Sequence, residues 1–175
     1  MPEGVIFQSQ TAYKELRKML VNQSLVAVIS LPAGCFNPYS GVKTSILILD
    51  KSLAKQADSI AFFKIENDGY GLGAQRRAVA NSDLPQVKKE LDEYLSALRQ
   101  RRSVTELAPT CGLIVTKEQL AANGEFNLSG ERYREGVANI PTFALVSLEE
   151  VFTKIGNGVN VTQIDETAKY RVSRI

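Results

Sequence analysis

Apolar and polar positions in the first third of the chain predict strands and helices in turn. Val5, Ile6 and Phe7 form a short apolar run that predicts the end of a buried strand. Residues 11–23 repeat at helical spacing, with an apolar stripe made of Tyr13, Leu16, Met19 and Leu20. The opposite side of that helix is predicted to carry Lys14, Glu15, Arg17 and Lys18.

Three further apolar runs predict strands. Residues 24–32 and 42–50 are almost continuously apolar, and residues 59–68 form one more strand-like run. Near-continuous apolarity in the first two indicates strands that are covered on both faces, as in a layered α/β sheet. The glycine-containing stretch that follows, residues 69–82, is typical of a loop.

The clearest helix in the pattern begins after Asp83, which is predicted to cap it, with Gln86 completing a capping box. Its buried stripe is predicted to consist of Leu84, Val87, Leu91, Leu95 and Leu98. Residues 103–110 are typical of a linker, and the next residues predict a short strand and a short helix capped by Thr116 with Gln119. The pattern therefore predicts an α/β domain followed by a helical or mixed α+β extension.

Composition restricts the chemistry that the chain can perform. With 175 residues, of which 44% are hydrophobic, it is long enough to bury a core, and its net charge of +2 does not by itself indicate a polyanion partner. The absence of histidine excludes histidine-based acid–base catalysis and histidine-dependent nucleophiles. Cys35 and Cys111 are too few for a metal cage, so we expect reduced core residues of a cytoplasmic protein. No apolar stretch reaches the roughly 18 residues of a membrane span.

A series of motifs in a fixed order resembles one protein family. The series runs through "PEGVIF" (2–7), "VISLP" (28–32), "GVKTSILILDK" (41–51), "DGYGL" (68–72), "NSDLP" (81–85) and "NLSGERY" (127–133). Over residues 2–135 the chain resembles the C-terminal half of the catalytic domain in methylation subunits of type I restriction-modification systems, which are adenine-specific DNA methyltransferases. Many separate pieces in the right order are far more specific than one motif. The resemblance implies that residues 1–103 are the C-terminal half of a Rossmann-like methyltransferase sheet.

Residues 37–39, Asn-Pro-Tyr, come within one proline of the Asn-Pro-Pro-aromatic catalytic signature of this family. In the family the catalytic loop lies upstream of the segment that matches this chain, so the resemblance implies that Asn37 is not catalytic. Residues 37–39 fall instead in a later loop, which in the family packs an aromatic ring against the flipped-out target base. The resemblance therefore implies a target-base pocket with Phe36 as the first candidate and Tyr39 as the second. The alternative is that Phe36 is a core aromatic residue at a strand edge.

Four side chains are candidate DNA contacts. Lys43 and Thr44 follow the aromatic loop and are predicted to steady it or to contact phosphate. Arg76 and Arg77 are candidate phosphate ligands because the arginine fork matches phosphate oxygens. The alternative for the arginines is a solvated surface cluster without a ligand.

The family enzyme requires S-adenosylmethionine, which binds at a glycine-rich turn between the first strand and first helix of its sheet. The glycine cluster of this chain, Gly69, Gly71 and Gly73, follows a predicted strand but does not lead directly into a helix. We therefore expect no cofactor site here. We also expect no metal site, because the chain has no histidine and only two cysteines. The chain is expected to start after the cofactor site and the catalytic loop, which a missing N-terminal half of the methyltransferase supplies. The family is enzymatic, but the chain alone is expected to be inactive.

The last part of the chain carries a second resemblance. Residues 104–136 are predicted to be an extension or linker of the methylation subunit. Residues 137–175 contain "FALVSLEEVFTKIGNGVN" and "YRVSRI", which resemble the start of a target-recognition domain from a type I specificity subunit. The alternative is a helical C-terminal extension.

The sequence leaves two functions open. In the first, the chain is a fragment of an adenine-specific DNA methyltransferase and forms one wall of the target-base pocket. In the second, it is a DNA-binding or docking module in which residues 83–175 join the methylation and specificity parts. Both imply DNA and a specificity subunit, or a fused specificity domain, as partners. A restriction subunit is a further implied partner, and no membrane is expected.

Overall fold

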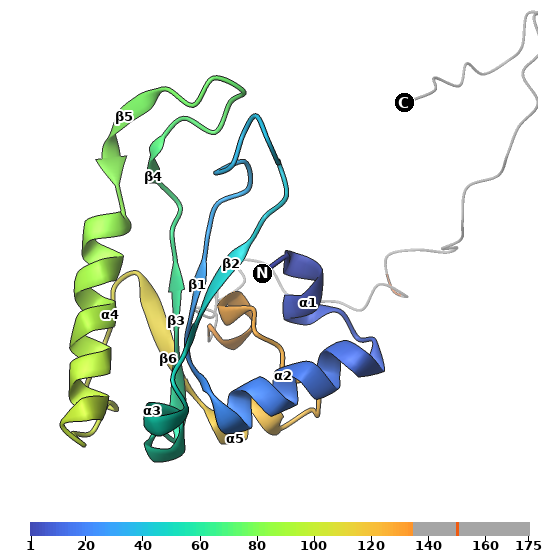
Figure 1. Cartoon of the computed structure of the whole chain (residues 1–175), viewed down its shortest axis with the longest axis vertical. Coiled ribbons are helices and arrows are strands. Elements are labelled where there is room, and N and C mark those ends of the chain that lie inside the picture. Colours follow the sequence, from blue (N-terminus) through green and yellow to red (C-terminus); the bar gives the residue numbers. More distant parts are fainter. Residues whose placement is uncertain (135–149, 151–175) are drawn as a thin grey trace, which may run out of the picture. The chain divides into compact units, whose positions relative to one another are not determined.

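The computed structural model describes residues 1–134 and 150 of the chain. Residues 1–134 belong to one compact unit, Met1–Glu135. A four-stranded mixed sheet in the order β2-β1-β3-β6 forms its centre (Figure 1). The strands are β1 (Leu25–Ser30), β2 (Ser45–Leu49), β3 (Ser59–Lys64) and β6 (Gly112–Thr116). β1 and β3 are parallel, whereas β2 and β6 pair antiparallel at the two edges.

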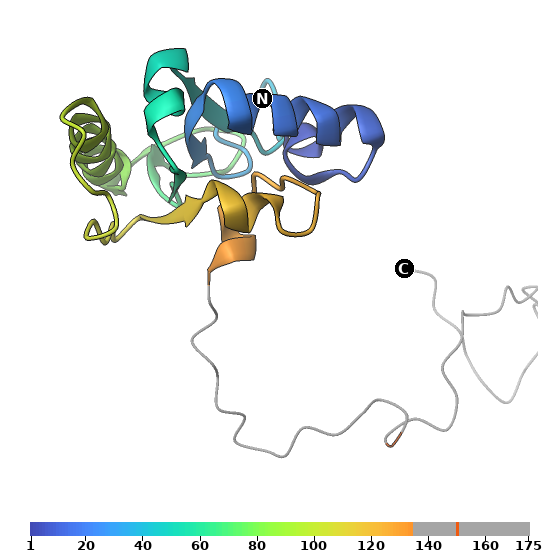
Figure 2. The ribbon, with the colours of Figure 1, turned by 90° about the horizontal axis from the view of Figure 1, so that it is seen from below.

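Helices cover both faces of this sheet. They are α1 (Glu3–Phe7), α2 (Thr11–Gln23), α3 (Lys51–Gln56), α4 (Leu84–Arg99), α5 (Lys117–Ala121) and a short 3-10 helix, η1 (Gly130–Tyr133). Seen from below, α4 lies on one side of the sheet and α1 with α2 on the other (Figure 2). The α/β class predicted from the sequence is therefore confirmed.

Successive residues of the central strands point into two separate cores, as the period of a strand requires. In β3, Ile60 and Phe62 pack with α1, α2 and α5, whereas Ala61 and Phe63 pack with α3 and α4. This burial on both faces explains why the sequences of β1 and β3 are continuously apolar.

The edge strand β2 departs from the prediction of burial on both faces. Ile46 is 44% exposed and Leu49 is 52% exposed, because β2 has a hydrogen-bonded neighbour in the sheet on one side only. An apolar run alone does not distinguish a central strand from an edge strand. The prediction that both faces of β2 are buried is therefore wrong.

The predicted loop over residues 69–82 is also wrong in part. β4 (Asp68–Tyr70) and β5 (Ala78–Ser82) pair antiparallel and form a hairpin. All residues of β5 are exposed, so the strand lacks the alternation of buried and exposed side chains by which a sequence pattern is recognised.

The N-terminal run Val5–Ile6–Phe7 forms the end of helix α1, not of a strand. Only Ile6 of this helix is buried, and Phe7 is exposed. Three apolar residues are too few to separate the helical period from that of a strand. Strand-like pairing does occur just before the helix, where Pro2 forms an antiparallel bridge with Thr44.

Helix α2 occupies the predicted residues, but its buried face differs from the predicted stripe. Arg17, predicted to face solvent, is fully buried together with Leu20 and Val21, while Met19 is exposed. The burial is tolerated because the Arg17 guanidinium donates hydrogen bonds to four backbone carbonyls, those of Val5, Gln8, Glu125 and Phe126. Desolvation of this group lowers the pKa of Arg17.

Helix α4 begins and ends near the predicted residues, but its cap is different. Asp83 does not cap the helix, because its carboxylate accepts the backbone N–H groups of Glu66 and Asn67 at 2.8 and 2.7 Å. Of the predicted stripe, Leu84 is exposed, and α4 buries Val87, Glu90, Tyr94, Ala97 and Leu98. The side chain of Asp83 therefore ties the start of α4 to the residues after β3.

Later predictions of local structure are partly confirmed. Thr116 and Gln119 form the predicted capping box at the start of α5. Cys35 and Cys111 are free thiols, but both are half-buried and neither belongs to the fully buried core. Strand β6, within the predicted extension 104–136, supplies one edge of the main sheet. The predicted target-recognition start, residues 137–175, lies outside the described residues apart from residue 150.

No helix in the described part of the chain is long and apolar enough to cross a membrane. Within residues 1–134 and 150, no group of three or more histidine, cysteine, aspartate or glutamate side chains is placed to hold a metal ion.

Candidate functional site

Two segments meet beyond one end of the sheet (Figure 1). One is the β1–β2 loop, residues 31–44, and the other is the β4–β5 hairpin, residues 68–82; we call this pair of segments the tip. The side-chain amide of Asn37 donates to the carbonyl oxygen of Leu72 at 2.8 Å. The guanidinium of Arg76 donates to the carbonyl oxygen of Gly34 at 3.3 Å. The tip is therefore held by hydrogen bonds between loop and hairpin.

The loop has a defined backbone around Phe36. Gly34 has a φ of +80°, and a Cβ atom added there would lie 2.8 Å from the side-chain nitrogen of Asn37 and 3.2 Å from the carbonyl oxygen of Leu72. The backbone N–H groups of Tyr39 and Ser40 both donate to the Phe36 carbonyl, at 2.9 and 3.1 Å. Phe36 therefore begins a hydrogen-bonded turn.

Phe36 is 49% exposed and Tyr39 is 94% exposed, so neither ring is a core residue. The tip also exposes Val42, Tyr70, Leu72 and Val79, and thus holds six of the twelve large apolar side chains that are exposed within residues 1–134. A gathering of exposed apolar side chains is typical of a surface that binds a ligand or a partner.

The two tip arginines differ in their surroundings. Arg76 forms an ion pair with Asp68, and its guanidinium carbon lies 5.4 Å from the centre of the Tyr70 ring. The side chains of Arg76 and Asp68 are only 17% and 9% exposed. Arg77 is exposed, and its guanidinium donates to the side chain of Gln75 at 3.1 Å. Arg77 thus presents its charge to solvent, whereas Arg76 faces into the tip.

The other two predicted DNA contacts lie where the loop meets the N-terminal segment. Lys43 forms an ion pair with Glu3 at 3.0 Å. Thr44 pairs through its backbone with Pro2, and its carbonyl accepts the N–H of Leu31 at 3.0 Å. The Thr44 hydroxyl oxygen is buried and has no hydrogen-bond partner among the described residues. The structure therefore places Lys43 and Thr44 at the base of the loop.

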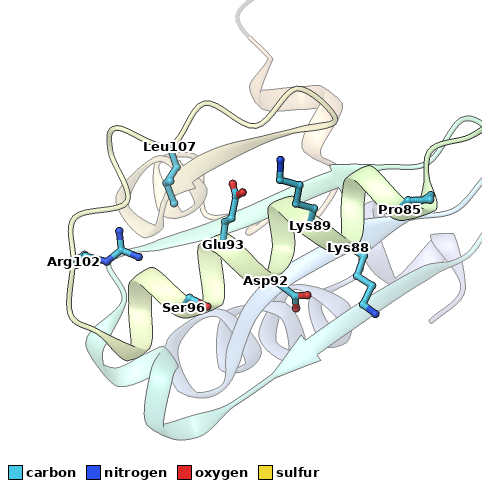
Figure 3. Close-up of a pocket in the computed structure, with 8 residues that line it drawn as sticks. All are labelled: Pro85, Lys88, Lys89, Asp92, Glu93, Ser96, Arg102 and Leu107. Carbon is cyan, nitrogen blue, oxygen red and sulfur yellow. The ribbon is translucent and has the colours of Figure 1, made fainter.

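A separate groove of about 590 Å³ runs along α4 and the residues after it (Figure 3). Its lining residues are Pro85, Lys88, Lys89, Asp92, Glu93, Ser96, Arg102 and Leu107. No aromatic ring lines the groove, so it offers no stacking surface for a nucleobase. Its lining side chains carry both signs of charge, which suits a partner with charged groups.

The glycine cluster does not fit the S-adenosylmethionine turn of a methyltransferase. Such a turn is rich in glycine and lies between a strand and a helix. Gly69, Gly71 and Gly73 instead lie in the β4–β5 hairpin, which continues into a strand.

The family model described as N-6 DNA Methylase matches residues 1–139 of the chain. The chain belongs to this family. The resemblance found in the sequence is thereby confirmed at the level of the family. Among curated proteins, none matches this N-6 DNA Methylase chain.

One solved structure shows the same fold, and a second gives a weaker match. A chain from a type I R-M system, solved in work on complex assembly and conformational transition, has a TM-score of 0.56 and 22% identity. The similarity covers 86% of this chain and 30% of that one. The type I restriction-modification methyltransferase subunit from Streptococcus thermophilus has a TM-score of 0.47 and 22% identity, over 75% of this chain and 25% of that one. The N-6 DNA Methylase chain therefore spans less than a third of the length of either relative.

The sequence predicts Phe36, Tyr39 and the arginines as site residues but does not indicate the contacts between loop and hairpin. It suggests no role for Tyr70 or Leu72, and none for Asn37 beyond the rejected catalytic one. The available signal was the motif "DGYGL" (68–72), which contains both the ion-pair partner of Arg76 and the carbonyl that Asn37 contacts.

Proposed function

We propose that this chain forms the target-base side of an adenine-specific, amino-group DNA methyltransferase of a type I restriction-modification system. The observation that carries the proposal is the exposed ring of Phe36 on a defined loop, in a chain of the N-6 DNA Methylase family. Tyr39 is the second candidate for contact with the base, and it is almost fully exposed.

The chemistry explains why an exposed aromatic ring is needed. The amino group of adenine cannot be methylated inside the duplex, so the base has to leave the stack at a cost of a few kcal/mol. Stacking on an aromatic side chain returns about 1–3 kcal/mol per base. In this proposal, Phe36 holds the plane of the extrahelical base and Arg77 contacts a nearby phosphate. Lys43 and Thr44 hold the base of the loop and are the second choice for phosphate contacts.

The methyl donor and the catalytic loop are proposed to lie in an N-terminal half of the complete methyltransferase. S-adenosylmethionine supplies the methyl group there, and an Asn-Pro-Pro-aromatic loop holds the amine. The hairpin fold of Gly69, Gly71 and Gly73 supports this division, because it removes the one glycine cluster that resembled a cofactor turn. The chain alone is accordingly expected to be inactive.

The partners of the chain follow from the same proposal. They are DNA, the N-terminal half of the methyltransferase, and a specificity subunit or fused specificity domain, with a restriction subunit as a further member of the assembly. In this proposal, residues 1–103 and the segment 104–136, which adds β6 to their sheet, form the methyltransferase part, and residues 137–175 are the start of the specificity region.

One experiment tests the proposal in the complete enzyme. Phe36→Ala is expected to lower kcat/KM for DNA methylation by roughly 5- to 150-fold, the equivalent of one lost stacking contact. Affinity for S-adenosylmethionine should stay within about twofold, since the proposal places the methyl donor in the N-terminal half of the enzyme. Phe7→Ala is the matched control, because Phe7 is similarly exposed at 44% but lies in α1. Equal loss of methylation and cofactor affinity, or no loss of either, would contradict the proposal.

The groove along α4 favours a second function, docking of the specificity region. Lys88 and Lys89 line this groove together with Asp92 and Glu93. Reversing both lysines to glutamate should weaken co-purification of the specificity subunit without changing the fold. Reversal of Lys51 and Lys55, two exposed lysines of α3, is the charge-matched control. If both double variants retain the subunit equally, the groove is not the docking surface.

A further inference from the structure

We infer that Arg76 and Asn37 are positioning residues, which together lock the Phe36 loop to the β4–β5 hairpin. The inference rests on the proposed function of Phe36 and adds the residues that control where its ring stands. It also gives Arg76 a different role from the phosphate contact predicted from the sequence.

Arg76 is held by three different interactions inside the tip. It forms an ion pair with the buried carboxylate of Asp68, lies over the ring of Tyr70 and donates to the carbonyl of Gly34. The first two contacts are within the hairpin and fix the guanidinium, whereas the third reaches the loop, 42 residues away in sequence. A guanidinium engaged in this way, with only 17% of the side chain exposed, has little of its fork left for phosphate.

Asn37 makes the complementary connection. Its side-chain amide belongs to the loop and donates to the Leu72 carbonyl of the hairpin, whereas Arg76 belongs to the hairpin and donates to the Gly34 carbonyl of the loop. Each segment thus supplies one donor and one acceptor. Gly34 precedes Phe36 by two residues and Asn37 follows it directly, so the two hydrogen bonds bracket Phe36.

Glycine at position 34 allows this close approach. Its φ of +80° is strained for other residues, and a Cβ atom there would meet the side chain of Asn37 and the carbonyl of Leu72 at once. We call the two hydrogen bonds, Asn37 to Leu72 and Arg76 to Gly34, the lock. The lock depends on the close approach of the loop and hairpin backbones at Gly34.

As a consequence of these two hydrogen bonds, the Phe36 ring is held in position before the target base binds. An unbraced surface loop has to lose about 1–2 kcal/mol of conformational entropy for each backbone residue that it orders. Bracing by hydrogen bonds removes that requirement at the moment of base binding, which is the benefit of a preorganised site. The lock should therefore affect the catalysed step more than the stability of the fold.

The test uses Arg76→Lys in the complete methyltransferase, with Asn37→Ala as a second variant and Arg99→Lys, at an exposed position of α4, as the matched control. Lysine keeps the charge of Arg76 but loses the planar fork that serves Asp68 and Gly34 together. Hydrogen exchange reports on the loop directly, because the amides of Asn37, Tyr39 and Ser40 are hydrogen-bonded within it. Both lock variants should exchange these amides about tenfold faster and lower kcat about tenfold, which corresponds to about 1.4 kcal/mol, within the range of one lost hydrogen bond.

The thermal midpoint and the affinity for S-adenosylmethionine should stay at the parent values in both lock variants, and Arg99→Lys should change neither exchange nor kcat. Unchanged loop exchange in Arg76→Lys, or an equal effect of Arg99→Lys, would overturn the inference. Faster exchange over the whole chain with a lower thermal midpoint would make Arg76 merely structural and would also overturn it.

The Phe36→Ala variant separates this inference from the proposed function. If Phe36→Ala lowers methylation and Arg76→Lys does not, only the lock is wrong. If Phe36→Ala leaves methylation unchanged, the proposed function of the ring is wrong, whatever the exchange data show.

Discussion

The guanidinium of Arg17 donates to the carbonyl of Phe126 at 3.0 Å, across 109 residues of the chain. The same group donates to the carbonyls of Val5 and Gln8, at 2.9 and 3.0 Å. One side chain of α2 therefore joins the N-terminal segment to the segment that follows α5, beneath the face of the sheet opposite to α4.

Replacement of this arginine is expected to destabilise the whole unit. Arg17→Met keeps much of the side-chain volume but leaves buried carbonyls without donors, so the free energy of unfolding should fall by about 3 kcal/mol or more. Urea denaturation of the chain followed by circular dichroism measures the difference. Lys18→Met, on the exposed side of the same helix, should change stability by no more than about 0.5 kcal/mol. A similar loss in both variants would show that the carbonyl contacts of Arg17 contribute little.

Glu90 gives the fold a dependence on acid pH. Burial on its own raises the pKa of Glu90, but hydrogen bonds from Thr110, Gln86 and Cys111 outweigh burial and lower the pKa of the carboxyl group. Because the pKa is lower in the folded state, the ionised carboxylate stabilises the fold fully above the unfolded pKa of about 4.3. This contribution is lost as the pH falls through the lower, folded pKa.

Glu90→Gln should have a lower free energy of unfolding than the parent at pH 7. The difference in free energy should shrink as the pH falls below about 4, where the parent also loses its carboxylate. Urea denaturation at pH 7 and pH 3 measures both differences. Glu93→Gln, at an exposed position of the same helix, serves as the control. A gap between Glu90→Gln and the parent that stays constant with pH would contradict this role of the carboxylate.

Truncation tests where the folded unit ends. A chain that ends at Glu135 retains the whole compact unit, so it should unfold in one cooperative transition. A chain that ends at residue 103 lacks β6, which pairs with β3 from Ser59 to Phe63, and should lose that transition. Circular dichroism during urea denaturation distinguishes the two. Loss of cooperativity in the longer chain would place part of the folding information in residues 136–175.

The central strands of the main sheet are predictable from the sequence because their composition reflects how deeply they are buried. Both faces of β1 and β3 are buried, so an apolar run was a sufficient signal, and the apolar stripe of α4 similarly indicated a packed helix. Local rules failed where a distant partner decided the outcome. Arg17 looked like a surface residue because the carbonyls that it contacts lie 108 and 109 residues away.

The candidate site was only partly predictable for the same reason. The resemblance to the family pointed to Phe36, but whether this ring is buried or exposed depends on how the loop is held. That support comes from the hairpin through Asn37 and Arg76, over 35 and 42 residues of sequence. The sequence predicts a loop in place of the hairpin, because β5 has no buried side chain.

Photo-crosslinking would show directly whether the target base stacks on the loop that carries Phe36. A DNA duplex with 5-iodouracil at the target position would be irradiated with the complete methyltransferase, and the linked peptide identified by mass spectrometry. The expected crosslink lies within residues 31–44, at Phe36, and is lost in Phe36→Ala and kept in Phe7→Ala. A crosslink that maps outside residues 31–44 and persists in Phe36→Ala would contradict it.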